Sequence, residues 1–126
     1  MRFEGFVLVA GLAIAPVAAY ASAATEIVTA QTHADLAAHA ADLAGVQMHL
    51  HHVVNCLVGP TGTGFDSKEL NPCANAGNGA IPDSTDAAQK KMLNDAVTKA
   101  ESGIAATQMA VAQKAASDTA AMLKGK

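Results

Sequence analysis

The sequence predicts an all-α protein: a long antiparallel helical hairpin whose connecting loop is stapled by a disulfide. Two stretches, 26–58 and 85–124, carry apolar residues at helical spacing. Between them lies a segment rich in Gly, Pro, Asn and Asp, residue types that favour turns over helices. Cys56 and Cys73 are the two cysteines of the chain. Cys56 lies at the end of the first stretch, and Cys73 lies within the segment of turn residues.

Residues 1–23 have the pattern of a secretory signal peptide. A charged start is followed by an apolar run, and Ala21 and Ala23 match the small residues that precede a cleavage site. The run is shorter than the ~20 residues that cross a bilayer, although a retained N-terminal anchor is the alternative. We therefore expect cleavage after Ala23, one mature domain over 24–126, and a periplasmic or secreted protein with no membrane attachment.

The composition excludes several classes of function. The chain has a formal net charge of -3, whereas nucleic-acid binding needs clustered Lys and Arg. Phe65 is the only aromatic residue after position 23, so no platform for stacking bases can form, and neither nucleotide nor haem is expected. No nucleophile, acid and base can be grouped, so we do not expect an enzyme.

The first expected helix covers 26–58. Its apolar positions step by three and four, and Gly59 and Pro60 end it, because proline cannot continue a helix. The predicted seam consists of Leu36, Ala40, Leu43, Gln47, Leu50, Val54 and Leu57.

The loop, 59–83, is long for a compact domain, and such loops are usually functional or stapled. In an exported protein an even number of cysteines predicts a disulfide, here Cys56–Cys73, worth ~3 kcal/mol in the chain-entropy model. Two free thiolates that bind a metal are the alternative.

The second expected helix, 85–124, begins after a Ser84 or Thr85 cap and has two apolar faces. Because the first helix covers only one of them, we expect a homodimer of hairpins that forms a four-helix bundle. Gly45 and Gly103 each interrupt a predicted helix at a cost of ~1 kcal/mol relative to alanine. Two long helices are expected, and shorter helices on each side of a break are the alternative.

All five histidines fall in the first predicted helix. His49 and His52 share a face, because a spacing of three residues is nearly one turn. Met48, one turn from His51 and His52, adds a thioether, and imidazole with thioether favours copper. We expect a copper or zinc ion bound by Met48, His49, His51 and His52, with loop groups orienting the rings.

Several alternatives stay open. The histidines can instead anchor the disulfide loop of a structural or protein-interaction module. A zinc site of His49, His52, Cys56 and Cys73 has suitable residue types, but its spacing is atypical. A non-covalent haem at His33 or Met109 ranks last, since His33 and His39 are expected to be packing or surface residues.

Overall fold

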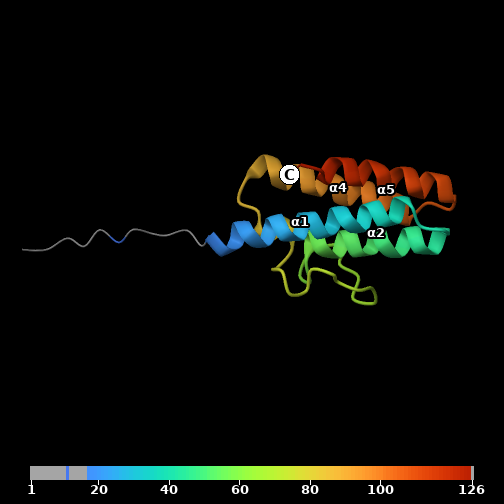
Figure 1. The fold of residues 1–126 in the computed structure, drawn as a ribbon. Helices are drawn as coiled ribbons and strands as arrows, with labels where there is room; N and C mark the ends of the chain where they lie inside the picture. The colour runs from blue at the N-terminus through green and yellow to red at the C-terminus, as the bar shows by residue number, and fades with distance from the viewer. Residues whose placement is uncertain (1–10, 12–16, 126) are drawn as a thin grey trace, which may run out of the picture.

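The structure, a computed structural model, describes residue 11 and residues 17–125. These residues form five helices and no strand: α1 (Val17–Ala38), α2 (Leu43–Val58), α3 (Ala80–Asp83), α4 (Ala87–Ile104) and α5 (Met109–Leu123). The all-α prediction is therefore confirmed. Four long helices lie side by side, and α3 is a short turn beside one end of them (Figure 1).

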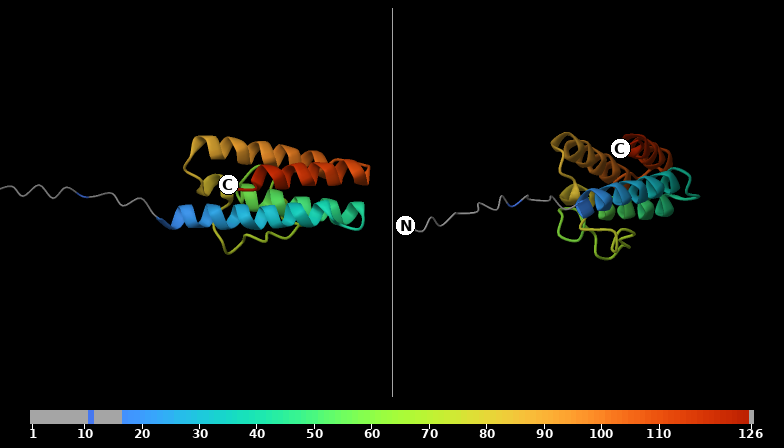
Figure 2. Two further views of the ribbon diagram at one scale, coloured as in Figure 1. Left: turned by 45° about the horizontal axis from the view of Figure 1, so that its top comes forward. Right: turned by 60° about the vertical axis from the view of Figure 1, so that its left-hand side comes forward.

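The four long helices form a closed ring of contacts. α1 packs on α2 and on α5, and α4 packs on the same two helices, so that α1 and α4 lie across the bundle from each other. Figure 2 shows the ring from two further sides, with the connecting loop lying outside α2. One chain therefore supplies all four helices of the bundle.

The expected signal peptide lies mainly outside the described residues, which leave out 1–10 and 12–16. Within the described part of the chain, no helix combines the length and the apolar character that a bilayer span requires.

The single helix predicted over 26–58 is wrong, because a short turn divides it into α1 and α2. Asp42 caps α2: its Oδ1 accepts a hydrogen bond from the N–H of Gly45 at 2.7 Å. On the other side of the turn, the Nδ1–H of His39 donates to the carbonyl of Asp35 at 2.8 Å, which satisfies a carbonyl in the last turn of α1. These two local side chains stabilise the turn against a continuous helix.

The single helix predicted over 85–124 is also wrong, because α4 ends at Ile104 and α5 begins at Met109, after four intervening residues. The intervening residues contain neither Gly nor Pro. A side chain from another helix stabilises this turn: Gln47 Nε2 donates to the carbonyls of Ile104 at 2.8 Å and Ala106 at 3.1 Å. The alternative of shorter helices on each side of a break is therefore the correct one.

The two turns are tied to each other at one end of the bundle (Figure 1). Besides the Gln47 contacts, Gln113 Nε2 of α5 donates to the carbonyl of Ala40 at 3.2 Å. Each turn thus receives an amide from a helix to which it does not belong. Because turn carbonyls would otherwise lack partners, these bonds favour four helices over two longer ones.

The dimer was expected in order to cover the second apolar face of 85–124. In the structure α4 and α5 cover each other and also pack on α2 and α1. The reason for expecting a second copy no longer holds, and homodimerisation stays a prediction.

Small side chains dominate the core where α1 packs on its neighbours. Ala30, Ala34 and Ala37 of α1 are fully buried, and they share one core cluster with Leu50 and Leu57 of α2. The predicted seam is wrong for Leu36, which is 46% exposed. The seam assumes one continuous helix, whereas a turn separates Leu36 from the seam positions in α2. An alanine face lets two helix backbones approach closely, since little side-chain volume separates them.

Gly103 is required by packing. A Cβ built there would lie 2.5 Å from Leu50 Cδ1 and 3.0 Å from Ala115 Cβ. We expect Gly103→Ala to lower the free energy of unfolding by about 1–2 kcal/mol, because overpacking outweighs the gain in helix propensity. Urea denaturation measures the change. Gly45→Ala is the matched control, since its nearest contacts are 3.2 Å and it should be neutral or stabilising. Equal effects of the two substitutions would contradict this account.

Glu26 of α1 is a fully buried carboxyl group. Its Oε1 accepts a hydrogen bond from the N–H of Gly79 at 2.8 Å, and its Oε2 has no hydrogen-bond partner among the described residues. Burial raises the pKa of Glu26, the Gly79 hydrogen bond lowers it and the nearby Asp83 carboxylate raises it, and together they move this pKa from 4.5 to about 7. The Glu26 side chain is therefore largely protonated below neutral pH and loses its proton at a buried position above it.

This raised pKa makes stability pH-dependent. The folded state holds a proton that the unfolded chain releases near pH 4.5, so the Glu26 contribution is present below that pH and is lost as pH rises through about 7. As the pH rises from 4.5 to 8, we expect the free energy of unfolding of Glu26→Gln to increase by about 2–3 kcal/mol relative to that of the wild type. Urea denaturation across this range, with the exposed Glu101→Gln as control, measures the difference. A constant difference would show that Glu26 stays ionised throughout.

Candidate metal centre

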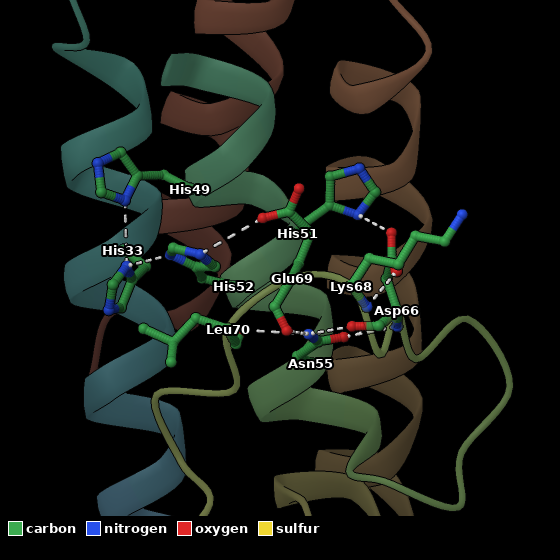
Figure 3. A network of polar contacts seen from close by, with 9 residues as sticks. All are labelled: His33, His49, His51, His52, Asn55, Asp66, Lys68, Glu69 and Leu70. Carbon is green, nitrogen blue, oxygen red and sulfur yellow. Dashed lines mark hydrogen bonds and ion pairs between the residues drawn. The ribbon is translucent and has the colours of Figure 1, made fainter. Parts of the chain in front are cut away.

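Three histidine rings meet between α1 and α2 (Figure 3). His33 projects from α1, and His49 and His52 project from one face of α2. His33 Nδ1 lies 3.2 Å from His49 Nδ1 and 3.3 Å from His52 Nδ1. One ligand atom from each ring falls within 4.8 Å of the other two. The ring centroids are 5.0–5.6 Å apart, so the rings surround a common point rather than stack in a column.

These separations fit a first-row metal ion. An ion bound at the usual Zn–N distance of about 2.0–2.1 Å in tetrahedral geometry holds its nitrogens about 3.3 Å apart. The two Nδ1–Nδ1 distances from His33 match that edge without movement of either helix. Three protein nitrogens make three of the four ligands that such an ion requires.

Two of the three rings are held in the neutral state that a metal needs. Burial, together with the neighbouring His52 and His49, lowers the pKa of His33 to about 4. Burial, His49 and His51 lower the pKa of His52, whose side chain is almost inaccessible. His33 and His52 are therefore neutral at pH 7, with lone pairs available for coordination.

Without an ion, the three Nδ1 atoms must share protons. Because His33 Nδ1 approaches both other Nδ1 atoms, one consistent arrangement places the proton on His33, donated to His49 and His52. Moving that proton to Nε2 of His33 leaves all three Nδ1 lone pairs free to coordinate an ion. A metal thus requires only one change of tautomer in the neutral cluster.

A buried asparagine fixes the loop beside the cluster. The Asn55 amide donates to the carbonyls of Asp66, Glu69 and Leu70 at 2.9, 3.3 and 3.1 Å. Its Oδ1 accepts from the N–H of Asp66 at 2.8 Å. One fully buried side chain of α2 therefore holds the backbone of 66–70 in place.

The loop held in this way presents two carboxylates to α2. Asp66 Oδ2 lies 3.6 Å from His51 Nδ1, and Glu69 Oε2 lies 3.8 Å from His52 Nε2. Figure 3 shows the two pairs on different sides of the helix, with only the Glu69 pair next to the three-histidine cluster. The expectation that loop carboxylates face the histidines is correct for these two residues.

The structure brings together only part of the predicted ligand set. His49 and His52 lie in the cluster. His51 turns toward Asp66 instead, and Met48, which is 40% exposed, is not one of the three converging residues. A role for His51 and Met48 as ligands therefore stays a prediction that this geometry does not support.

Sequence reasoning missed His33, which was expected to be a packing or surface residue. The relation between His33 and the other histidines becomes visible once the position of the turn between α1 and α2 is known. His33 and His49 are equally distant in sequence from Ala41, in the middle of that turn. Residues at equal distances from a hairpin turn lie at the same level of the two helices, so the turn brings these histidines together where the faces that carry them also meet. His39, in contrast, is an exposed residue whose ring bonds its own helix, as expected.

The predicted disulfide is confirmed. Cys56 and Cys73 are bonded, with their Cα atoms 5.1 Å apart, and both residues are buried. No free cysteine remains. The alternative zinc site of two cysteines and two histidines is therefore wrong, because bonded sulfurs are not thiolate ligands.

Comparison of the chain with protein families, curated proteins and solved structures gives no significant match.

The lowered pKa of His33 predicts acid sensitivity of the metal-free protein. The unfolded chain takes up a proton near pH 6.5 that the folded protein accepts only near pH 4, so stability falls as pH drops through this window. We expect the free energy of unfolding to fall by about 1–2 kcal/mol less in His33→Asn than in the wild type over this window, after allowance for solvent screening. Chemical denaturation at pH 7.5 and 4.5 measures the loss, and the exposed His39→Asn serves as control. An unchanged pH profile in His33→Asn would mean that the ring protonates freely in the folded state.

Proposed function

We propose that this protein binds a transition-metal ion through His33, His49 and His52. The observation that carries the proposal is the convergence of three imidazoles from two helices at the spacing of metal ligands. Imidazole nitrogens suit zinc, copper, nickel and iron, whereas calcium and magnesium prefer oxygen ligands. The proposed ion is divalent zinc or copper.

Without an ion, the two acceptor rings share a single donor, because His33 Nδ1 approaches both His49 Nδ1 and His52 Nδ1. An ion at the common point gives every Nδ1 lone pair a partner. The proposal describes binding, storage or sensing rather than catalysis, because three histidines alone do not define a reaction.

Export is proposed from the N-terminal pattern. Cleavage after Ala23 would leave 24–38 of α1, which retains both Glu26 and His33. A buried disulfide suits an oxidising compartment such as the periplasm, because cytosolic thiols are normally kept reduced.

Metal affinity tests the proposal directly. Chelator-treated protein is titrated with Zn²⁺ and Cu²⁺ against a chromophoric competitor, and we expect one ion per chain. Replacing His33, His49 or His52 singly with Ala should weaken binding at least ~100-fold, since each removes one of three protein ligands. His51→Ala is the matched control because His51 is adjacent to His52 in the chain but faces Asp66. Full affinity in His33→Ala would overturn the assignment.

Thermal unfolding gives a second readout. A ligand that binds only the folded state at 100 times its Kd stabilises it by about 2.7 kcal/mol. We expect Zn²⁺ or Cu²⁺ to raise the Tm of the wild type and of Met48→Leu, but not that of His49→Ala. If Met48→Leu lost copper binding, the thioether would belong to the ligand set after all.

A second candidate function is a structural or protein-interaction module in which the histidines anchor the loop. The two histidine–carboxylate pairs between α2 and the loop favour it. This alternative predicts that His51→Ala and His52→Ala lower the Tm of metal-free protein equally, and that added metal changes neither Tm. The metal proposal predicts a large effect of metal and a difference between the two variants.

A further inference from the structure

The loop approaches the histidine cluster from the side of His52 that faces away from the cluster. His52 directs Nδ1 toward His33 and Nε2 toward Glu69, so its two nitrogens face different partners. The His52 side chain is only 8% exposed, whereas that of Glu69 is 34% exposed. The ring is therefore held by packing, and the carboxylate keeps the freedom to move the short distance that separates them.

The separation of 3.8 Å is longer than a hydrogen bond, which needs about 2.7–3.2 Å. A metal on Nδ1 withdraws electron density from the ring and makes its Nε2–H a stronger donor. A rotation of the Glu69 side chain then closes the gap while the backbone stays in place. Metal-binding histidines almost always donate their second N–H to such a partner, which fixes the tautomer and the ring orientation.

The position of Glu69 depends on two restraints from α2. Asn55 accounts for one, because it binds the carbonyls of Glu69 and Leu70. The disulfide from Cys56 to Cys73 accounts for the other, because it closes the loop on the C-terminal side of Glu69. Asn55 and Cys56 follow His52 by three and four residues, so the same helical turns hold the ring and the loop.

We propose that Glu69 is a positioning residue of the metal site, and that the Cys56–Cys73 staple sets the metal affinity by holding Glu69 against Nε2 of His52. The inference rests on the proposed function, since it assigns the control of affinity at the same three-histidine site. Glu69 acts through His52 and does not touch the ion, because it lies on the opposite edge of the ring.

A matched pair of loop substitutions tests the role of Glu69. Glu69→Gln and Asp66→Asn remove the same charge from the same Asn55-held segment, but only Glu69 faces a cluster histidine. We expect Glu69→Gln to weaken Zn²⁺ binding 10–100-fold, the usual effect of losing such a partner, and Asp66→Asn to change it less than threefold. Equal losses in the two variants would reduce the effect to general electrostatics and overturn the proposal.

A double-mutant cycle tests the role of the staple. Replacing both cysteines with alanine frees the loop without adding thiolates that bind metal themselves. We expect Cys56→Ala/Cys73→Ala to weaken Zn²⁺ binding about tenfold, and Glu69→Gln to have a smaller effect in that background than in the wild type. An equally large Glu69→Gln effect in both backgrounds would show that the staple does not act through Glu69. Far-UV circular dichroism verifies that the cysteine-free variant is folded, and if it is not, the loop-substitution pair and the tautomer measurement decide the proposal.

The tautomer of His52 separates failure of this inference from failure of the metal site. Long-range ¹H–¹⁵N spectra of the metal-free protein report which ring nitrogen carries the proton. We expect the proton on Nε2 of His52 in the wild type and in Asp66→Asn, and a mixture of tautomers in Glu69→Gln. A proton on Nδ1 in the wild type would overturn the positioning role even if metal binds. The expected tautomers without any Zn²⁺ binding would leave Glu69 as an orienting residue and remove the metal function.

Discussion

The turn between α1 and α2 is the constraint on which the rest of the structure depends. It folds what looks like one helix back on itself, and it pairs positions of α1 and α2 that are equally distant from Ala41. His33 meets His49 for that reason, and the i,i+3 spacing of α2 adds His52 to the same point. The Asp42 cap stabilises the turn locally, and Gln113 stabilises it from α5.

The alanine-rich composition is what makes this pairing effective. Ala30, Ala34 and Ala37 are fully buried, so little side-chain volume separates the backbone of α1 from the helices it packs on. Larger residues on this face would separate the helices and move His33 out of reach. The thin core has a consequence for stability, since little apolar area is buried per residue, and the buried Cys56–Cys73 bridge offsets part of that deficit.

The connecting loop is ordered by α2 rather than by its own secondary structure. Asn55 satisfies four backbone groups of the loop, and the disulfide follows at the next residue. The same stretch of helix therefore carries two cluster histidines, the loop clamp and the staple. These groups fall within the eight residues from His49 to Cys56, whereas His33 and the loop carboxylates come from elsewhere in the chain.

The sequence by itself determined the helical class, the position of the loop, the disulfide and the importance of the histidine-rich segment. Each of these follows from local signals: apolar periodicity, turn residues, paired cysteines and helical spacing. The two breaks were only partly visible, because Asp42 is a recognisable cap, whereas the turn after Ile104 is stabilised by Gln47 from another helix. Only the tertiary structure brings His33 of α1 beside His49 and His52 of α2. The physical reason is that helical spacing specifies which residues share a face of one helix, but not which face of a second helix packs against it.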